Sequence, residues 1–280
     1  MVTNAQLKKL WWTARSEGFK GCYTLVRGKL AGKSVDVDRA SGISISRLKG
    51  SDAKGVNSRY KQWSDLIPLP PASLMFSVGA QSVENFLVVG DAWAQLVSRY
   101  TEPEASLLDI GCGCGRTARF LSLNPNIKSY TGFDVIRENI EWCQHYITPV
   151  AASNFNFLHY DIFSEEYNQK GTIKVDDFSF PAEDGSITVV FAASLFTHLR
   201  EKDCRHYLSE ISRVLTPGQG RAIISIHIDT TRDLPFKGTE TRIDIDPDYF
   251  AQLLDQYNLS IKERIGEVCG QETFVIGHKR

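Results

Sequence analysis

Three aspartates each stand at the end of a short apolar run, and a glycine-rich bend follows the first of them. Asp109 precedes the alternating glycines of segment 111–115, whereas Asp134 and Asp161 end the next two runs. Glycine adopts positive φ at a sharp turn and, lacking a Cβ, lets the backbone approach a ligand closely. Carboxylates at the carboxyl ends of parallel strands accept hydrogen bonds from nucleotide hydroxyl and amino groups. The pattern therefore predicts a nucleotide-type cofactor site along one edge of a sheet.

The elements that would position these groups alternate between strands and helices. Unbroken apolar runs separated by helical segments favour a parallel sheet covered on both faces. The predicted strands are 107–110, 129–133, 155–160, 187–193 and 222–228, and the predicted helices between them are 116–123, 137–146 and 203–214. Upstream, 83–87 and 92–100 suggest two helices; downstream, 249–257 suggests a helix before strands 260–264 and 272–276. We therefore expect an α/β fold with seven strands, mostly parallel, that ends in an antiparallel strand pair.

Four segments together resemble the class I S-adenosylmethionine-dependent methyltransferases, of the type 11 and type 25-like kind. The sequence DIGCGCG at 109–115 resembles the first motif of that family. FPAEDGSITVV at 180–190, SLFTHL at 194–199 and TPGQG at 216–220 resemble the later segments. The resemblance covers about residue 107 to the C-terminus and departs from the family pattern at Ile187, Thr188 and Gln219. It implies a Rossmann-like, doubly wound fold and S-adenosylmethionine as cofactor.

The same resemblance implies cofactor contacts for particular residues. Asp109 would lie near the methionine amino group, and the backbone at Ala193 would face the same end of the cofactor. The expected cofactor set comprises Asp109, Gly111, Cys112, Gly113 and Arg116 of the first motif, Asp134 on the ribose hydroxyls, Val135 and Ile136 against the adenine, Asp161 and Ile162 on the adenine amino group and ring, and Ala193. A looser resemblance of 69–79 to the leader of some bacterial methyltransferases of glycan pathways implies a lid at Phe76–Gly79.

The acceptor must be inferred from the residues after the fourth strand. A hydroxyl acceptor needs a base that removes its proton. Histidine as a residue type suits that task, and His198 stands at the expected place. Alternatively, His198 only hydrogen-bonds a neighbouring loop. Ala193–Phe196 replaces the Asn/Asp-Pro-Pro-Tyr/Phe motif of many amino-group methyltransferases, and no nucleic-acid-binding module is recognisable. We expect O-methylation of a small-molecule or sugar acceptor and no nucleic-acid partner.

Charge divides the chain into a basic head and an acidic body. Up to Lys61 there are 13 Lys and Arg against 4 Asp and Glu, whereas the remainder has 19 against 29. We expect a basic N-terminal extension with amphipathic helices and a linker over 1–60, a lid or leader over 61–105 and the core over 106–280. The basic extension suggests peripheral contact with an anionic membrane surface; a solvated helix face with a linker is the other interpretation.

Cysteine usage and hydropathy exclude several classes. Six scattered cysteines without zinc-type spacing predict reduced thiols and no metal. The absence of a long apolar stretch or a secretory signal predicts a cytoplasmic protein, with membrane association only at its surface. Two alternatives stay open. One is a noncatalytic protein that binds S-adenosylmethionine; the other is an NAD-dependent oxidoreductase, although its fingerprint places the third glycine three residues after the second rather than two.

Overall fold

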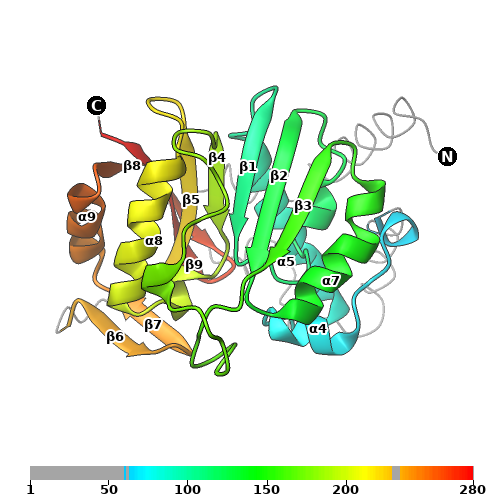
Figure 1. The fold of residues 1–280 in the computed structure, drawn as a ribbon, viewed down its shortest axis with the longest axis horizontal. Coiled ribbons are helices and arrows are strands. Elements are labelled where there is room, and N and C mark those ends of the chain that lie inside the picture. The colour runs from blue at the N-terminus through cyan, green and yellow to red at the C-terminus, as the bar shows by residue number, and fades with distance from the viewer. Residues whose placement is uncertain (1–59, 61–62, 229–233, 280) are drawn as a thin grey trace.

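A sheet of nine strands organises the part of the chain that the structure describes. The computed structural model describes residues 60, 63–228 and 234–279. The sheet order is β3-β2-β1-β4-β5-β7-β6, with β9 antiparallel along β5 and β8 paired to β9 (Figure 1). The strands are β1 Ala105–Ile110, β2 Ile127–Asp134, β3 Asn154–His159, β4 Val189–Ala192, β5 Arg221–Ile228, β6 Phe236–Thr239, β7 Arg242–Ile245, β8 Leu259–Val268 and β9 Gln271–His278. The first five strands are mutually parallel.

Helices complete the doubly wound arrangement. They are α4 Ala72–Ser77, α5 Val83–Ser98, α6 Ala118–Leu121, α7 Arg137–Tyr146, α8 Glu201–Val214 and α9 Pro247–Gln256, with short 3-10 helices η2 Thr148–Val150, η3 Val175–Asp177 and η4 Phe196–His198. None of the described helices is long and apolar enough to cross a membrane. The Rossmann-like fold with its C-terminal antiparallel strand pair is confirmed.

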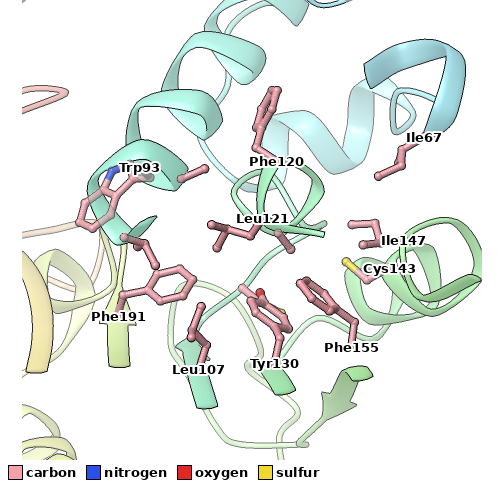
Figure 2. Close-up of a cluster of buried hydrophobic side chains, with 14 of the residues drawn as sticks. Ile67, Trp93, Leu107, Phe120, Leu121, Tyr130, Cys143, Ile147, Phe155 and Phe191 are labelled. Atoms are coloured by element: carbon pink, nitrogen blue, oxygen red, sulfur yellow. The ribbon is translucent and has the colours of Figure 1, made fainter. Parts of the chain in front are cut away.

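The two faces of the sheet bury separate apolar cores because successive residues of a strand point to opposite sides. Leu107 of β1 belongs to one core, with residues of α5, α6 and α7, whereas Leu108 belongs to the other, with residues of α8 and α9. Figure 2 shows the first core, in which Leu107, Tyr130 and Phe191 of the sheet lie below Leu121 of α6. Tyr130 stacks on Phe155 at 4.4 Å between ring centroids, which holds its ring beneath the glycine loop.

Three local expectations need correction. The segments predicted as two helices form one, α5, because Gly90 in its middle lets the helix lie against the carbonyl of Arg116. The helix expected over 116–123 is reduced to α6. The sheet has nine strands rather than seven, because β6 and β7 form a hairpin that extends the sheet beyond the end of β5.

The basic extension expected over 1–60 falls outside the described residues except for Tyr60. From Trp63 onward, the segment expected to be a lid or leader can be described. Its 68–71 stretch has no regular structure, and α4 follows. In Figure 1, α4 and the β6–β7 hairpin both lie at the lower edge of the sheet, which is where the candidate site is found.

Candidate functional site

A cavity of about 230 Å³ opens at the carboxyl ends of β1, β2 and β4. This is the edge at which open α/β sheets bind ligands. Of the predicted site residues, the cavity is lined by Asp109, Gly111, Cys112, Gly113, Arg116, Asp134, Val135, Ile136, Ala193 and His198. Lining residues that the sequence did not single out as site residues are Thr117, Phe133, Asn139, Tyr167, Ser194, Leu195 and Tyr207. Ser77, Val78 and Gly79 complete the wall.

The glycine loop between β1 and α6 forms the floor of the cavity. Gly111, Gly113 and Gly115 all have positive φ, between 55° and 75°, a region that side chains with a Cβ rarely enter. A Cβ added to Gly113 would lie 2.3 Å from Cγ1 of Val78. The bare backbone at Gly113 therefore accommodates the segment after α4 as well as leaving room for a ligand.

Asp109 ends β1 as a buried carboxyl group. Its Oδ2 accepts a hydrogen bond of 2.5 Å from the hydroxyl of Tyr130. Burial raises the pKa of Asp109 to about 7, although the Tyr130 hydrogen bond opposes this shift. A carboxyl group held in this way favours a positively charged ligand group, because a cation would restore the ionised form.

Asp134 ends β2 beneath the glycine loop. Its Oδ2 accepts from the Gly113 amide at 2.9 Å and its Oδ1 from the Ile136 amide at 2.8 Å. Burial raises the pKa of Asp134, while these amides and the Asn139 side chain lower it. Each carboxylate oxygen has two lone pairs, so Asp134 can still accept hydrogen bonds from ligand hydroxyls. Val135 follows it and lines the cavity with apolar surface.

Arg116 contributes the cationic group of the site. Its Nη1 donates to the Val78 carbonyl at 2.9 Å, and burial lowers its pKa. No carboxylate within the described part of the chain forms an ion pair with it. A half-buried guanidinium without a carboxylate ion pair among the described residues is well suited to bind an anionic ligand group.

Asp161 and Ile162 do not line the cavity. The Asp161 carboxylate accepts hydrogen bonds from the Asn168 side chain at 2.9 Å and from the backbone and hydroxyl of Thr172 at 3.1 and 2.8 Å. These bonds lower its pKa. Asp161 thus closes the irregular segment 162–173 on itself, and its expected contact with the adenine stays a prediction.

His198 lies at the end of η4 on the acceptor side of the cavity. Its Nδ1 is 2.7 Å from the carbonyl oxygen of Glu240, and its Nε2 is 3.2 Å from the hydroxyl of Tyr167. A carbonyl can only accept, so Nδ1 carries the hydrogen of the neutral ring and Nε2 carries the lone pair. The structure therefore presents a base at Nε2, with the Tyr167 hydroxyl as its donor partner.

The turn after β4 forms part of the cavity wall. Ser194 has a positive φ of 65°, which costs free energy for a residue with a side chain. Its amide donates to Ser225 at 2.9 Å, and the Gln271 side chain donates to its hydroxyl at 2.5 Å. β5 and β9 thereby hold the strained turn that places Ala193 and Leu195 against the cavity.

The two residues that contact the His198 ring, and that the sequence did not single out, come from segments without a pattern. Tyr167 lies in the irregular stretch 162–173, and Glu240 lies between β6 and β7, 42 residues from its partner His198. No spacing rule connects these positions. Neither residue belongs to a cluster of three or more His, Cys, Asp or Glu that could hold a metal, and the described residues contain no such cluster.

Residues 108–224 match the model of a family described as "Methyltransferase domain". An O-methyltransferase of Pyrenophora dematioidea is 27% identical over 128 residues, which cover 45% of this chain and 41% of that protein. A 2-methyl-6-phytyl-1,4-hydroquinone methyltransferase of Synechocystis sp. is 24% identical over 244 residues, which cover 80% and 66%. The chain thus spans between two fifths and two thirds of these relatives.

Two solved structures share the fold. An S-adenosylmethionine-dependent methyltransferase from Clostridium acetobutylicum matches with a TM-score of 0.51 and 10% identity. The match covers 79% of this chain and 99% of that one. A magnesium protoporphyrin IX methyltransferase from Synechocystis PCC 6803, solved with bound cofactor, matches with a TM-score of 0.50 and 13% identity over 83% and 100% of the two chains. The matched family favours methyl transfer over the oxidoreductase alternative.

Proposed function

We propose that the chain, whose residues 108–224 match a methyltransferase domain, transfers a methyl group from S-adenosylmethionine to a hydroxyl group of a small-molecule or sugar acceptor. The observation that carries the proposal is the orientation of His198. Its Nδ1 is bound to a backbone carbonyl at 2.7 Å, which leaves Nε2 as the accepting nitrogen at the cavity wall.

The cofactor, when bound, supplies an electrophilic methyl group on a sulfonium. The residues of the site fit its other parts. Asp109 offers a buried carboxylate to the ammonium group, and Arg116 offers a guanidinium to the carboxylate. Asp134 has free lone pairs for the ribose hydroxyls, and Val135 offers apolar surface to the adenine.

His198 would take the proton of the acceptor hydroxyl at Nε2 as the hydroxyl oxygen becomes the nucleophile. General base catalysis by a positioned side chain contributes about 10²- to 10⁴-fold to a rate. Ala193 and Leu195 form the wall between the base and the glycine loop. This wall would orient the acceptor, and orientation supplies much of the rate when two reactants are brought together.

The charges of the cavity favour an acceptor whose reacting end is uncharged. Among the lining residues, Arg116 is the only Lys or Arg, and in this proposal the cofactor carboxylate engages it. The remaining surface near His198 comes from Tyr167, Leu195 and Tyr207. A neutral hydroxyl compound, aromatic or saturated, fits that surface better than a phosphate or a nucleic-acid backbone does.

The test is methyl transfer from labelled S-adenosylmethionine to a panel of phenols, sugars, amines and RNA by the full chain. We expect product only with hydroxyl acceptors, and His198→Gln to lower kcat about 10²- to 10⁴-fold without changing the Kd for S-adenosylhomocysteine. His206→Gln is the matched control, because the His206 Nε2 also binds a carbonyl, that of Phe178 at 2.6 Å, but lies outside the cavity wall.

Three results would refute the proposal. Methyl groups found on nitrogen would rule out a hydroxyl acceptor. A fully active His198→Gln variant would rule out His198 as the base. Cofactor binding without turnover on any acceptor would favour the noncatalytic alternative instead.

A further inference from the structure

Four residues from three separate segments form a closed ring of hydrogen bonds around His198 at the cavity. His198 donates from Nδ1 to the Glu240 carbonyl at 2.7 Å, and the Glu240 Oε2 accepts from the Ser164 hydroxyl at 2.9 Å. The Ser164 Oγ accepts from the Tyr167 amide at 3.2 Å, and the Tyr167 hydroxyl reaches His198 Nε2 at 3.2 Å. Glu240 is the member that joins the base to the segment carrying Tyr167.

The surroundings of Glu240 are unusual for the tip of a hairpin. It is only 8% exposed, and buried carboxylates require partners. Besides Ser164, its carboxylate accepts from the Glu166 amide at 3.3 Å and lies 3.6 Å from the guanidinium of Arg200. The hairpin is fixed in turn, because β7 pairs with the end of β5.

We propose that Glu240 is a positioning residue that acts through His198 and Tyr167. This inference rests on the proposed methylation of a hydroxyl group. The Glu240 carbonyl fixes the ring of His198 so that Nε2 faces the cavity, and its carboxylate holds segment 164–167 over that nitrogen. Glu240 thereby sets both the tautomer of His198 and the position of segment 164–167 next to it.

The ring of hydrogen bonds leaves Nε2 of His198 as the atom that receives the proton of the acceptor hydroxyl. Before the acceptor enters, the Tyr167 hydroxyl donates to Nε2; the acceptor hydroxyl then takes its place as donor. In the proposed transfer, the acceptor oxygen would bond to the methyl carbon as the methyl–sulfur bond breaks and leaves its electron pair on the sulfur. The proton of the acceptor would move to Nε2, and the imidazolium would keep its Nδ1 hydrogen on the Glu240 carbonyl. Partial burial raises the pKa of Tyr167 to about 12, so Tyr167 stays a donor throughout.

The experiment compares the full chain with Glu240→Ala, Glu240→Gln and the control Thr241→Ala. Thr241 is the exposed neighbour in the same turn, and its hydroxyl forms a hydrogen bond of 2.8 Å with the hydroxyl of Thr239. Long-range ¹H–¹⁵N spectra of the histidine rings, assigned with His198→Gln, report the tautomer without any acceptor. Turnover, the KM for each substrate and the Kd for S-adenosylhomocysteine complete the measurement.

Glu240→Ala keeps the backbone carbonyl but removes the carboxylate contacts to Ser164, the Glu166 amide and Arg200, which hold the turn in place. We therefore expect the carbonyl to move away from Nδ1, the pure Nδ1–H tautomer to be lost and kcat to fall by about 10- to 100-fold, as a misplacement near 1 Å can cause. The Kd for S-adenosylhomocysteine should stay within about twofold, since Glu240 does not line the cofactor cavity. Glu240→Gln keeps one accepting side-chain oxygen, which Glu240→Ala lacks, so it should recover most of the lost rate. Thr241→Ala should match the unsubstituted chain.

A folded Glu240→Ala variant with an unchanged tautomer and unchanged kcat would overturn the inference. If that variant does not fold, Ser164→Ala tests the same link from the other side, and full activity there would overturn it equally. If Glu240→Ala changes the tautomer but no hydroxyl acceptor is ever methylated, the positioning of His198 is supported and the proposed hydroxyl methylation alone fails.

Discussion

The carboxyl group of Asp109 makes cofactor binding a proton-linked event. Its pKa of about 7 means that a large fraction of the ligand-free protein carries it protonated at neutral pH. An ammonium group binds the ionised form, so binding releases a proton wherever the group was protonated. The raised pKa also means that Asp109 favours the folded state at low pH and that this stability is lost as the pH rises through about 7.

We therefore predict that the affinity for S-adenosylhomocysteine weakens as the pH falls below about 7, approaching tenfold per pH unit. Calorimetry at pH 6, 7 and 8, in buffers with different ionisation enthalpies, measures both the affinity and the released proton. Asp109→Asn should bind more weakly at pH 8 and show no such dependence. An affinity that is constant over this range, with no proton release, would contradict the prediction.

Two different roles can be assigned to the carboxylate of Asp161. The resemblance assigns it to the adenine, whereas its three hydrogen bonds to Asn168 and Thr172 assign it to segment 162–173. That segment carries Tyr167, whose hydroxyl reaches His198. Removal of the Asp161 carboxylate should therefore displace segment 162–173 and, with it, the Tyr167 hydroxyl next to His198.

We predict that Asp161→Ala lowers the kcat/KM for the acceptor about tenfold, within the range caused by small misplacements, and changes the Kd for S-adenosylhomocysteine less than threefold, or by less than about 0.7 kcal/mol. Asp134→Ala is the comparison, because Asp134 lines the cavity and should weaken cofactor binding directly. If instead Asp161→Ala weakens cofactor binding as strongly as Asp134→Ala, the adenine contact is the correct assignment.

At the scale of elements, the central strands β1, β4 and β5 were predictable because each buries both faces and so forms an unbroken apolar run. The run at 222–228 is an example: five successive residues of β5, 222–226, are buried. The β6–β7 hairpin was not predictable, since its residues alternate between polar and buried and only Ile243 and Ile245 enter the core. Its pairing with β5 is a tertiary contact without a local signal.

The arrangement of the elements also explains which residues of the site could be predicted from the sequence. Most of the cavity-lining residues near the strand ends were predictable, because a local sequence motif marks the turn that follows a strand. The residues around His198 were not, because Tyr167 and Glu240 reach it from an irregular segment and a hairpin turn. Their positions depend on the packing of elements that are distant in the sequence.

The contact between α5 and the glycine loop provides a test of packing between elements. A Cβ at Gly90 would lie 2.2 Å from the Arg116 carbonyl oxygen, so the loop would have to move. We predict that Gly90→Ala destabilises the fold by about 1–3 kcal/mol, despite the gain of about 1 kcal/mol in helix propensity. Thermal melts and binding of S-adenosylhomocysteine check this, and both should worsen together.

Val88→Ala on the same helix is the matched control. Val88 is 37% exposed, so its truncation should change the free energy of unfolding by no more than about 0.5 kcal/mol. A Gly90→Ala variant as stable as this control, with unchanged ligand affinity, would show that the loop adapts without cost.

At the scale of the whole molecule, the charge asymmetry separates the basic extension from the catalytic domain. Residues 1–61 carry an excess of nine positive charges and the remainder an excess of ten negative charges. The body would be repelled by an anionic membrane, so any attraction must come from the extension. Each Lys or Arg near such a surface contributes about 1 kcal/mol, and salt screens the attraction.

We predict that the full chain sediments with vesicles that contain phosphatidylserine but not with vesicles of phosphatidylcholine alone. Raising the salt from about 0.1 M to about 1 M shortens the screening length from about 10 to about 3 Å and should release it. Substitution of Lys8, Lys9, Arg15 and Lys20 by Gln should weaken binding more than about tenfold and leave methyl transfer to a water-soluble acceptor unchanged. Binding that survives both high salt and these substitutions would point to apolar rather than electrostatic attachment, and no binding at low salt would mean that the basic extension is a solvated helix face with a linker.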